Sequence, residues 1–262
     1  AHLALSVYDE LEVSVCEQPG ATVVVHGVGE GEVPTDESNL VVRAIAHVFA
    51  HHGVALPGLD LIARNGIPQG RGMGSSAAAI VAGIMAARGL LEGIVEVTPD
   101  ELLAVATELE GHPDNVAPAL FGGLTIAWMT PEGPQHKRLT VHRGVSLLVA
   151  VPESSTMSTA LARSLQPESV PHEDAIFNVS RSALLIAALI QSPELLFAAT
   201  EDKLHQNYRA AAMPETHTLV TELRKQGLAA VVSGAGPSVL VLCSDPAQRL
   251  RAAELIEQHA TT

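Results

Sequence analysis

The chain has 262 residues, of which 47% are hydrophobic and 17% charged, so it can bury a sizeable core and is not intrinsically disordered. Acidic residues outnumber basic ones 29 to 15, which gives a formal net charge of −14 with the histidines neutral. Nucleic-acid binding needs clustered Lys and Arg as well as aromatic side chains that stack on bases. Because aromatic residues make up 3% of this acidic chain, no nucleic-acid partner is expected.

The cysteines and the apolar segments bear on the compartment. Cys16 and Cys243 lie far apart in apolar, strand-like runs, so two buried thiols in a reducing compartment are expected rather than a disulfide. No signal-peptide pattern opens the sequence, and it holds no unbroken run of about 20 apolar residues, the length of a membrane span. We therefore expect a cytoplasmic protein with no membrane partner.

The first half of the chain is predicted to alternate short strands with helices. Two β-branched runs at 11–15 and 21–25 flank a Pro-Gly turn and are expected to form a hairpin. Asp36 or Ser38 is expected to cap a helix that ends near Gly53. Further strands are expected at 3–7, 59–63 and 124–129, and further helices at 75–87 and 99–110, the second with Thr98 as its cap and Pro99 at its first position.

The second half is predicted to begin after the segment 130–134, which is the best candidate for a linker because it is rich in Pro and Gly. Behind it, strands are expected at 146–151, 229–232 and 238–243, and helices at 158–165, 174–190, 193–208, 219–226 and 246–259. Helices and strands mix without a regular strand–helix–strand repeat. This pattern indicates an α+β chain of two parts.

The most informative segment is Pro68-Gln69-Gly70-Arg71-Gly72-Met73-Gly74-Ser75-Ser76-Ala77-Ala78. Three glycines at alternate positions allow a tight turn, and the helix expected behind them presents its positive end, a combination that binds phosphate. The paired serines can offer a hydroxyl to phosphate or to Mg²⁺. The segment lacks the Lys of a Walker A loop and the spacing of a dinucleotide fingerprint. A glycine-rich turn that merely packs a helix on a sheet is the alternative, and the tandem serines and small-residue helix disfavour it.

This segment resembles the ATP loop of the GHMP kinases. Residues 110–123 (EGHPDNVAPALFGG) are similar to the segment that comes after the loop in the homoserine kinase branch of that family. Residues 233–238 (SGAGPS) are similar to the family's third, glycine-rich motif. The family's first motif, Pro-x-x-x-Ala-Asn-x-Gly-x-Gly-Phe-Asp, has no counterpart here, and residues 3–10 resemble the family segment that lies directly behind that motif. The Asn and Asp that this motif contributes to the substrate pocket are therefore not expected in these residues.

The resemblance implies an α+β, two-domain GHMP kinase fold, with an N-terminal domain like ribosomal protein S5 domain 2 at 1–143 and a ferredoxin-like C-terminal domain at 144–262. It implies a phosphotransferase that moves the γ-phosphate of ATP to the hydroxyl of L-homoserine in threonine biosynthesis, with ATP and Mg²⁺ as cofactors. Two alternatives stay open: another small-molecule GHMP kinase, and a truncated nucleotide-binding chain without activity. A homodimer is also left open.

The resemblance also assigns site residues. The loop residues Pro68–Ala78 are expected to bind ATP. Ser76 and Glu110 are expected to bind Mg²⁺, and together with Arg163 they are the expected catalytic residues. Arg163 and Arg209 are expected to hold the homoserine carboxylate, because a guanidinium can bind it through two parallel hydrogen bonds. The remaining expected substrate-binding residues are His112, Asn115, Thr159 and Gly234.

Other ionisable residues are expected to be turn, surface or loop residues. Asp114 is expected to be a turn residue, and Lys203 and Arg71 are expected to be surface or loop charges. Among the 12 histidines, His47 and His51 stand four apart on a predicted helix, a spacing that could share a metal. Because no Glu follows His47 as in an HExxH site and no third ligand is evident nearby, a metal site is not expected there.

Overall fold

The computed structural model describes residues 2–153 and 155–260, and the side chain of Thr159 lies outside the description. The described residues divide into two compact units. Unit 1 comprises the residues up to Gln69 together with Gly74–Leu139, and unit 2 comprises Gly70–Met73 together with the residues from Thr140 onward. The chain therefore passes from unit 1 into unit 2 at Gly70 and returns to unit 1 at Gly74, both within the glycine-rich loop. It passes into unit 2 again after Leu139.

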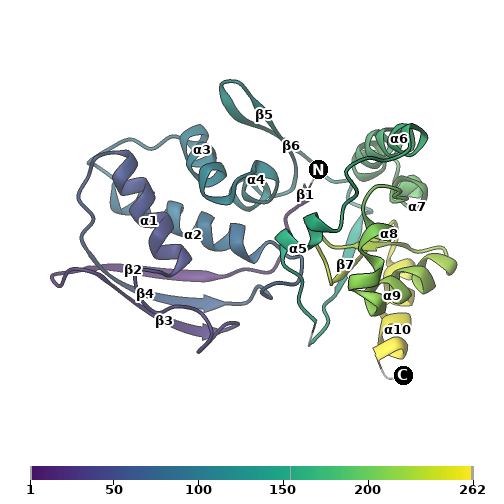
Figure 1. Cartoon of the computed structure of the whole chain (residues 1–262), viewed down its shortest axis with the longest axis horizontal. Helices are drawn as coiled ribbons and strands as arrows, with labels where there is room; N and C mark the ends of the chain where they lie inside the picture. The colour runs from purple at the N-terminus through teal and green to yellow at the C-terminus, as the bar shows by residue number, and fades with distance from the viewer. Residues whose placement is uncertain (1, 154, 261–262) are drawn as a thin grey trace. The chain divides into compact units, whose positions relative to one another are not determined.

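Unit 1 contains two sheets and the first helices of the chain (Figure 1). One sheet has the order β2 (Glu10–Cys16), β4 (Gly58–Asn65), β3 (Ala21–Gly27), and the other has the order β1 (His2–Leu3), β5 (Leu124–Thr130), β6 (Gly133–Leu139). The helices are α1 (Leu40–His51), α2 (Ser75–Leu90), α3 (Pro99–Glu110) and α4 (Pro113–Phe121).

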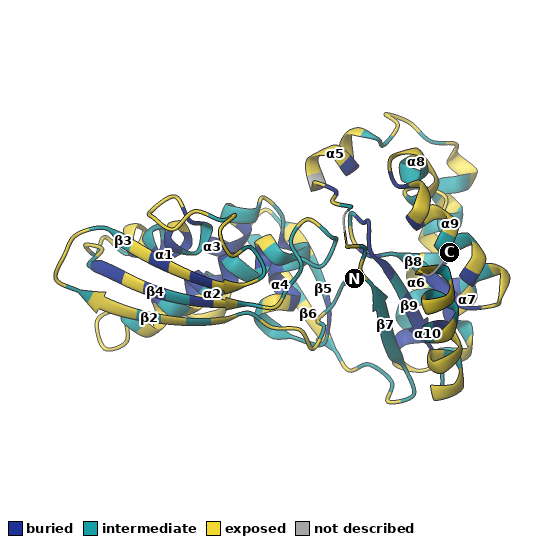
Figure 2. Ribbon diagram, turned by 90° about the horizontal axis from the view of Figure 1, so that it is seen from below, coloured by how far each residue is buried: buried dark blue, intermediate teal, exposed yellow. Residues whose placement is uncertain are grey.

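The core of unit 1 joins the β2-β4-β3 sheet to these helices. Side chains of a strand point alternately to its two faces, and Val23, Val25, Leu59 and Leu61 are buried on the face that the helices cover. Figure 2 shows the buried positions of β4 in dark blue between exposed ones. Their packing partners come from all the helices of the unit and include Ile45, Ile80, Leu103 and Val116. Burial of these apolar side chains is the main stabilising contribution, at about 25 cal/mol per Å² removed from water.

Unit 2 is built on the antiparallel sheet β7 (Ser146–Ala150), β9 (Val239–Cys243), β8 (Ala229–Val232), in that order. Helices α9 (Pro214–Lys225) and α10 (Pro246–Ala260) pack on this sheet and bury Leu223, Val241 and Ala252. The other helices are α5 (Thr159–Ser164), α6 (His172–Ile190), α7 (Leu196–Ala199) and α8 (Gln206–Arg209), with 3₁₀ turns at Pro193–Leu195 and Ala210–Ala212.

Several helices are confirmed at or near their predicted ends because their end signals are local. The Thr98 hydroxyl accepts the Glu101 N–H and the Glu101 carboxylate accepts the Thr98 N–H, each at 3.3 Å, so a reciprocal cap starts α3 with Pro99 in its first turn. Helices α2, α5, α6 and α10 also cover the predicted segments. Helix α1, however, is capped by Asn39, whose side chain accepts the Val41 N–H at 2.9 Å, and not by Asp36 or Ser38.

The predicted hairpin at 11–15 and 21–25 is wrong. Strands β2 and β3 lie on opposite sides of β4, with β2 antiparallel and β3 parallel to it. The Pro-Gly turn does reverse the chain, but a turn signal does not decide which strand lies next. β4 takes the central position, where it buries Leu59, Leu61 and Ala63 on one face, and it has more buried positions than β2 or β3.

The predicted linker at 130–134 is also wrong, because these residues form the tight turn between β5 and β6. Thr130 faces Gly133 across this hairpin, and the Thr130 hydroxyl donates to the Gly133 carbonyl at 2.9 Å. Strand β6 was not predicted, since its sequence (GPQHKRL) is polar and contains proline. Helix α4 was not predicted either, and the strand expected at 3–7 is limited to His2–Leu3.

The predicted helix at 193–208 is wrong in its middle, where the chain is not helical between Ala199 and Gln206.

The cysteines differ partly from expectation: both are free thiols, but Cys16 is only partly buried. Burial raises the pKa of the Cys243 thiol.

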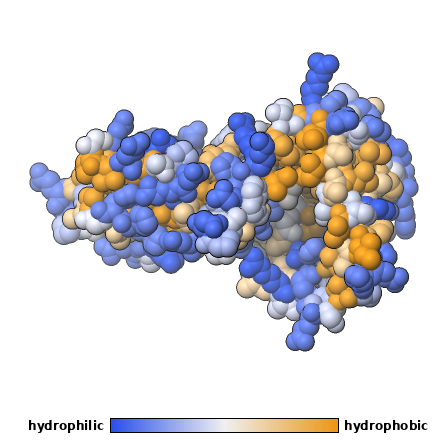
Figure 3. Space-filling view, turned by 90° about the horizontal axis from the view of Figure 1, so that it is seen from above, coloured by the Kyte–Doolittle hydropathy of each residue, from blue (hydrophilic) through white to orange (hydrophobic). Residues whose placement is uncertain are grey.

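On the face drawn in Figure 3, hydrophilic side chains are interspersed with apolar ones. No helix within residues 2–153 and 155–260 is both long and apolar enough to cross a bilayer.

Candidate functional site

The start of α2 has the features of an anion site. Gly74 precedes the helix in the left-handed conformation, with φ +75°, and offers no side chain to cap it. The first turn carries no acidic residue, and no described atom lies within 4 Å of the place that a Cβ on Gly74 would occupy. The space beside Gly74 is therefore open at the positive, N-terminal end of a helix, and such an end favours an anion.

Ser76 and Glu110 lie side by side in unit 1. The Ser76 hydroxyl on the first turn of α2 donates to Glu110 Oε2 at 3.0 Å. Glu110 is the last residue of α3, which ends there because Gly111 takes the left-handed conformation at φ +88°. A hydroxyl and a carboxylate oxygen are the ligands that Mg²⁺ prefers, so the chemistry of this pair fits the metal. Over the described residues, no group of three or more His, Cys, Asp or Glu side chains has the arrangement of a metal site.

His112 and Asn115 stand at the start of α4, directly after Glu110. His112 has extended backbone at the N-cap position and Asn115 lies in the first turn, both partly buried. In the described structure, the Nδ1 atom of His112 is buried without a hydrogen-bond partner. Such an atom costs free energy unless a ligand or water pairs with it, which favours a polar ligand here. Asp114, expected in a turn, belongs to the first turn of this helix.

In unit 2, the tip of the glycine-rich loop (Gly70–Met73) is joined to the third glycine-rich motif. The Ser233 hydroxyl donates to the Gly72 carbonyl at 2.8 Å, and the Gly236 N–H donates to the Ser233 carbonyl at 2.8 Å. A Cβ on Gly72 would collide with the carbonyl oxygen of Ser233, and its φ of +70° also favours glycine. The sequence did not predict that Ser233 positions the loop, although Ser233 belongs to the third glycine-rich motif.

The side chain of Arg71, a residue of this loop tip, joins the tip to a second segment of unit 2. Its guanidinium donates to the carbonyl of Pro152 at 2.6 Å and to the carbonyl of Glu153. The Gly70 carbonyl accepts the Met157 N–H at 2.8 Å. The expectation that Arg71 is merely a loop charge is therefore wrong, because its side chain fixes the backbone of the loop.

Unit 2 also brings Arg163, Arg209 and Gly234 together. Arg209 on α8 donates to the Gly234 carbonyl at 3.3 Å, and Arg163 lies on α5, which Ser158 caps. Burial lowers the pKa of the Arg209 guanidinium, the charge of Asp202 raises it, and the nearby charge of Arg163 lowers it again. Two like charges near one another are relieved by a bound anion, which suits a carboxylate site. The expected side chain of Thr159 lies outside the described residues.

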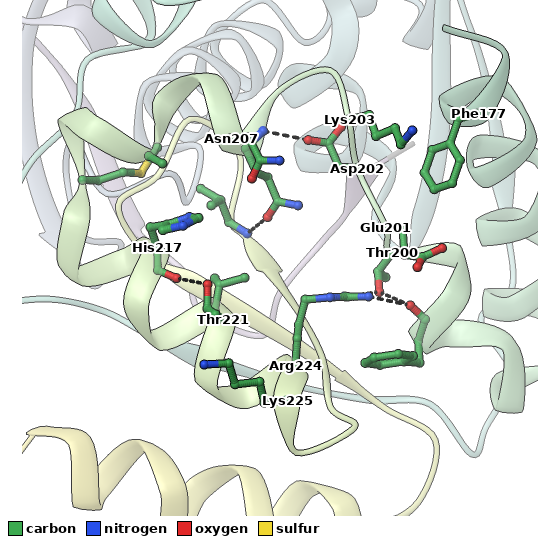
Figure 4. Close-up of a pocket in the computed structure, with 16 residues that line it drawn as sticks. Phe177, Thr200, Glu201, Asp202, Lys203, Asn207, His217, Thr221, Arg224 and Lys225 are labelled. Atoms are coloured by element: carbon green, nitrogen blue, oxygen red, sulfur yellow. Dashed lines mark hydrogen bonds between the residues drawn. The ribbon is translucent and has the colours of Figure 1, made fainter. Parts of the chain in front are cut away.

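A pocket of about 530 Å³ lies elsewhere in unit 2, among α6, α7, α8 and α9 (Figure 4). Figure 4 shows Arg224 reaching toward Thr200, to whose hydroxyl it donates at 3.0 Å, and Lys203 extending toward Phe177. Lys203 also pairs with Asp174 at 2.9 Å, so it is a surface charge as expected. Glu201 pairs with Arg181 at 2.7 Å. Lys203 and Glu201 are therefore engaged in ion pairs, whereas the Arg224 guanidinium donates to the neutral oxygens of Thr200, Ala230 and Phe197.

Comparison with known proteins identifies the family. A model of the GHMP kinase N-terminal domain matches residues 39–123, and a model of the GHMP kinase C-terminal domain matches residues 184–259. The chain is 75% identical to the homoserine kinase of Leifsonia xyli subsp. xyli over 254 residues, which cover 97% of this chain and 78% of that protein. It is 74% identical to the homoserine kinase of Clavibacter michiganensis subsp. michiganensis, over 99% of this chain and 82% of that protein.

A solved structure supports the fold independently. The crystal structure of homoserine kinase from Cytophaga hutchinsonii superposes with a TM-score of 0.84 at 24% identity, over 97% of this chain and 82% of that one. The expected α+β, two-domain GHMP kinase fold is thereby confirmed. With both family domains matched in order and high identity to these relatives over almost its whole length, the chain belongs to the homoserine kinases of the GHMP kinase family.

Proposed function

We propose that the chain transfers the γ-phosphate of ATP to the hydroxyl of L-homoserine, giving O-phospho-L-homoserine and ADP in threonine biosynthesis. The observation that carries this proposal is the 75% identity to a homoserine kinase over 97% of the chain. The chemistry of the predicted residues suits the reaction. It needs a phosphate site, oxygen ligands for a divalent cation, and cations for the carboxylate of an amino acid.

ATP binding is assigned to the loop Pro68–Ala78. The first-turn N–H groups of α2 would hold its phosphates, and Gly74 leaves room for them. Ser76 and Glu110 would bind Mg²⁺, which neutralises phosphate charge when bound. The protein then has mainly to position the two reactants for phosphoryl transfer. A bond forms between the homoserine hydroxyl oxygen and the γ-phosphorus while the bond from that phosphorus to the bridging oxygen of ADP breaks, and the hydroxyl proton is released to solvent.

Homoserine binding is assigned to the residues that the family resemblance predicts. Arg163 and Arg209 would hold the carboxylate through paired hydrogen bonds, and Arg163 counts with Ser76 and Glu110 among the catalytic residues. A Lys at either Arg position would keep the charge but lose the planar fork of donors. The other proposed contacts are His112, Asn115, Thr159 and Gly234.

The proposed domains are an ATP-binding domain at 1–143 and a C-terminal domain at 144–262. The two family matches, 39–123 and 184–259, fall on either side of that boundary. The division into units differs from it in two respects: the loop tip Gly70–Met73 packs with unit 2, and so do residues 140–143. A cytoplasmic location remains a prediction of the sequence.

A coupled assay of ADP release tests the proposal. The 262-residue chain and a version preceded by the family's first motif are each given ATP, Mg²⁺ and one alcohol: L-homoserine, mevalonate or galactose. Turnover with homoserine well above that with the others supports the assignment. Preference for another alcohol would identify a different GHMP kinase. ATP binding without turnover of any alcohol by either version would point to a nucleotide-binding chain without activity.

A further inference from the structure

Asp202 occupies the non-helical segment just before α8, the short helix that carries Arg209. Its side chain is 13% exposed, although the residue stands between α7 and α8 near the surface of unit 2. A carboxylate that is this well buried must be paired with donors to remain ionised. The donors that surround it show what the residue does.

The Asp202 carboxylate accepts the backbone N–H groups that lead into α8. Its Oδ2 atom accepts the His205 N–H at 2.9 Å and the Gln206 N–H at 2.7 Å. Its Oδ1 atom accepts the Leu204 N–H at 3.2 Å and lies 3.1 Å from His205 Nδ1. One side chain thus pairs with three consecutive N–H groups and fixes the direction in which α8 begins.

The same carboxylate is tied to a long helix. The Asn178 side chain on α6 donates to Asp202 Oδ1 at 2.8 Å, and its oxygen accepts the Lys203 N–H at 2.9 Å. Burial opposes the charge of Asp202, but the bonds from His205, Gln206 and Asn178 outweigh it, so the pKa of the Asp202 carboxyl lies well below its ordinary value. Asp202 is therefore a fixed anion that links α8 to α6.

Two more side-chain amides fix α8. The Gln206 side-chain oxygen accepts the Val232 N–H at 2.7 Å, which joins the first residue of the helix to the end of β8. With its amide turned to satisfy both neighbours, Gln166 accepts a hydrogen bond from Arg209 Nε at 2.9 Å and donates to the Leu204 carbonyl at 2.6 Å. Arg209, the last residue of α8, thus extends from a helix whose first turn is tied to α6 and β8, and its guanidinium is held by Gln166 and by the Gly234 carbonyl.

We propose that Asp202 is the positioning residue that holds α8, and through α8 the Arg209 guanidinium, in the geometry that binds the substrate carboxylate. The proposal rests on the proposed function, in which Arg209 contacts that carboxylate. Asp202 acts on Arg209 through three backbone N–H groups and through its charge. The residue was not predicted from the sequence as part of the site.

A double-mutant cycle tests it, with the KM for L-homoserine, the KM for ATP, kcat, and calorimetric binding of L-homoserine as readouts. Asp202→Asn keeps the shape of the side chain but turns a donor toward Leu204 and Asn178. We expect the homoserine KM to rise roughly tenfold, with the ATP KM unchanged and kcat changed by less than about threefold. In an Arg209→Ala background, Asp202→Asn should raise the homoserine KM no further.

Asp174→Asn is the matched control. It is the same substitution next to the same segment, but Asp174 contacts the exposed Lys203 side chain rather than the backbone of the segment. Its homoserine KM should stay within about twofold of wild type, since exposed ion pairs contribute little. If Asp202→Asn does not fold, Asn178→Ala takes its place. This variant removes one hydrogen bond to the carboxylate and should raise the homoserine KM in the same direction, again only while Arg209 is present.

The outcomes separate the two proposals. If Arg209→Ala alone leaves the homoserine KM unchanged, the carboxylate assignment fails and the role of Asp202 fails with it. If Arg209→Ala raises that KM but Asp202→Asn or Asn178→Ala does not, Asp202 has a structural role only. An equal rise from Asp202→Asn with and without Arg209 would likewise overturn the positioning role.

Discussion

At the scale of single residues, phosphate binding should depend on the absence of a side chain at Gly74. Valine there would have to adopt a φ of +75° and would fill the open space before α2. We predict that Gly74→Val weakens ATP binding at least about tenfold, while the fold survives with modest strain of roughly 1–2 kcal/mol. Isothermal calorimetry with ATP measures the first effect and thermal melting the second.

A matched control is available in Gly93, which lies away from the loop, has φ +80° and has no described atom within 4 Å of the place that a Cβ would take. Gly93→Val should cost similar stability and leave the affinity for ATP unchanged. Unaltered ATP affinity in Gly74→Val would remove the phosphate-loop assignment.

Glu110 should matter through its charge. Glu110→Gln keeps the size of the side chain and its contact with Ser76, but it removes the anion proposed to bind Mg²⁺. We predict that kcat falls at least about tenfold at limiting Mg²⁺, with little change in homoserine affinity. Glu108→Gln, on the exposed face of the same helix where Glu108 pairs with His47, should turn over normally. Normal turnover of Glu110→Gln at limiting Mg²⁺ would contradict the metal role.

Arg163 and Arg209 should matter through the shape of the guanidinium. A hydrogen bond to a charged group is worth about 1.5–3 kcal/mol, so Arg→Lys at either position should raise the homoserine KM roughly 10- to 150-fold. The ATP KM should stay nearly constant. Arg249→Lys, an exposed arginine on α10, serves as the control. Equal loss of ATP and homoserine affinity would indicate general unfolding, and no loss of either would make both arginines ordinary surface charges.

At the scale of elements, the segment before α8 should lose stability in acid. Since the pKa of Asp202 is lower in the folded chain than in the unfolded one, its contribution is complete above the ordinary Asp pKa of about 3.9 and is lost as the pH falls below it toward the folded value. We predict that the difference in Tm between wild type and Asp202→Asn is largest near pH 6 and shrinks below about pH 4. Calorimetric scans from pH 6 to pH 3 measure it, and a difference constant over that range would contradict the account.

How far the elements could be predicted depended on whether their signals were local. Thr98 and Pro99 define the start of α3 by themselves, and the sequence predicted that helix correctly. Asp202 is also a local signal, since Asp favours turns in which its side chain accepts N–H groups a few residues further on, and it could have indicated the break inside 193–208. The choice of β4 as the neighbour of both β2 and β3 could not be read locally, because it depends on which strand buries the most apolar surface.

At the scale of the whole molecule, the motifs were predictable but not their contacts. The pairing of Ser76 with Glu110 follows from two motifs that the sequence already placed in one site. The hydrogen bond from Ser233 to Gly72 joins residues 161 positions apart, and no pattern of residue spacing predicts it. The link from Asp202 to α6 and the role of Gln166 were missed for the same reason, since the bonds from Asn178 to Asp202 and between Gln166 and Arg209 join residues that are distant in sequence.

The reaction itself is tested most directly by identifying its product. The chain, with and without the family's first motif in front of it, is incubated with ATP, Mg²⁺ and L-homoserine and followed by ³¹P NMR. We predict that ADP accumulates together with a phosphate ester whose phosphorus couples to the terminal CH₂ protons of homoserine, in equal amounts. ADP with inorganic phosphate alone, or ATP that both versions leave unchanged, would contradict the assignment of the chain as a kinase of L-homoserine.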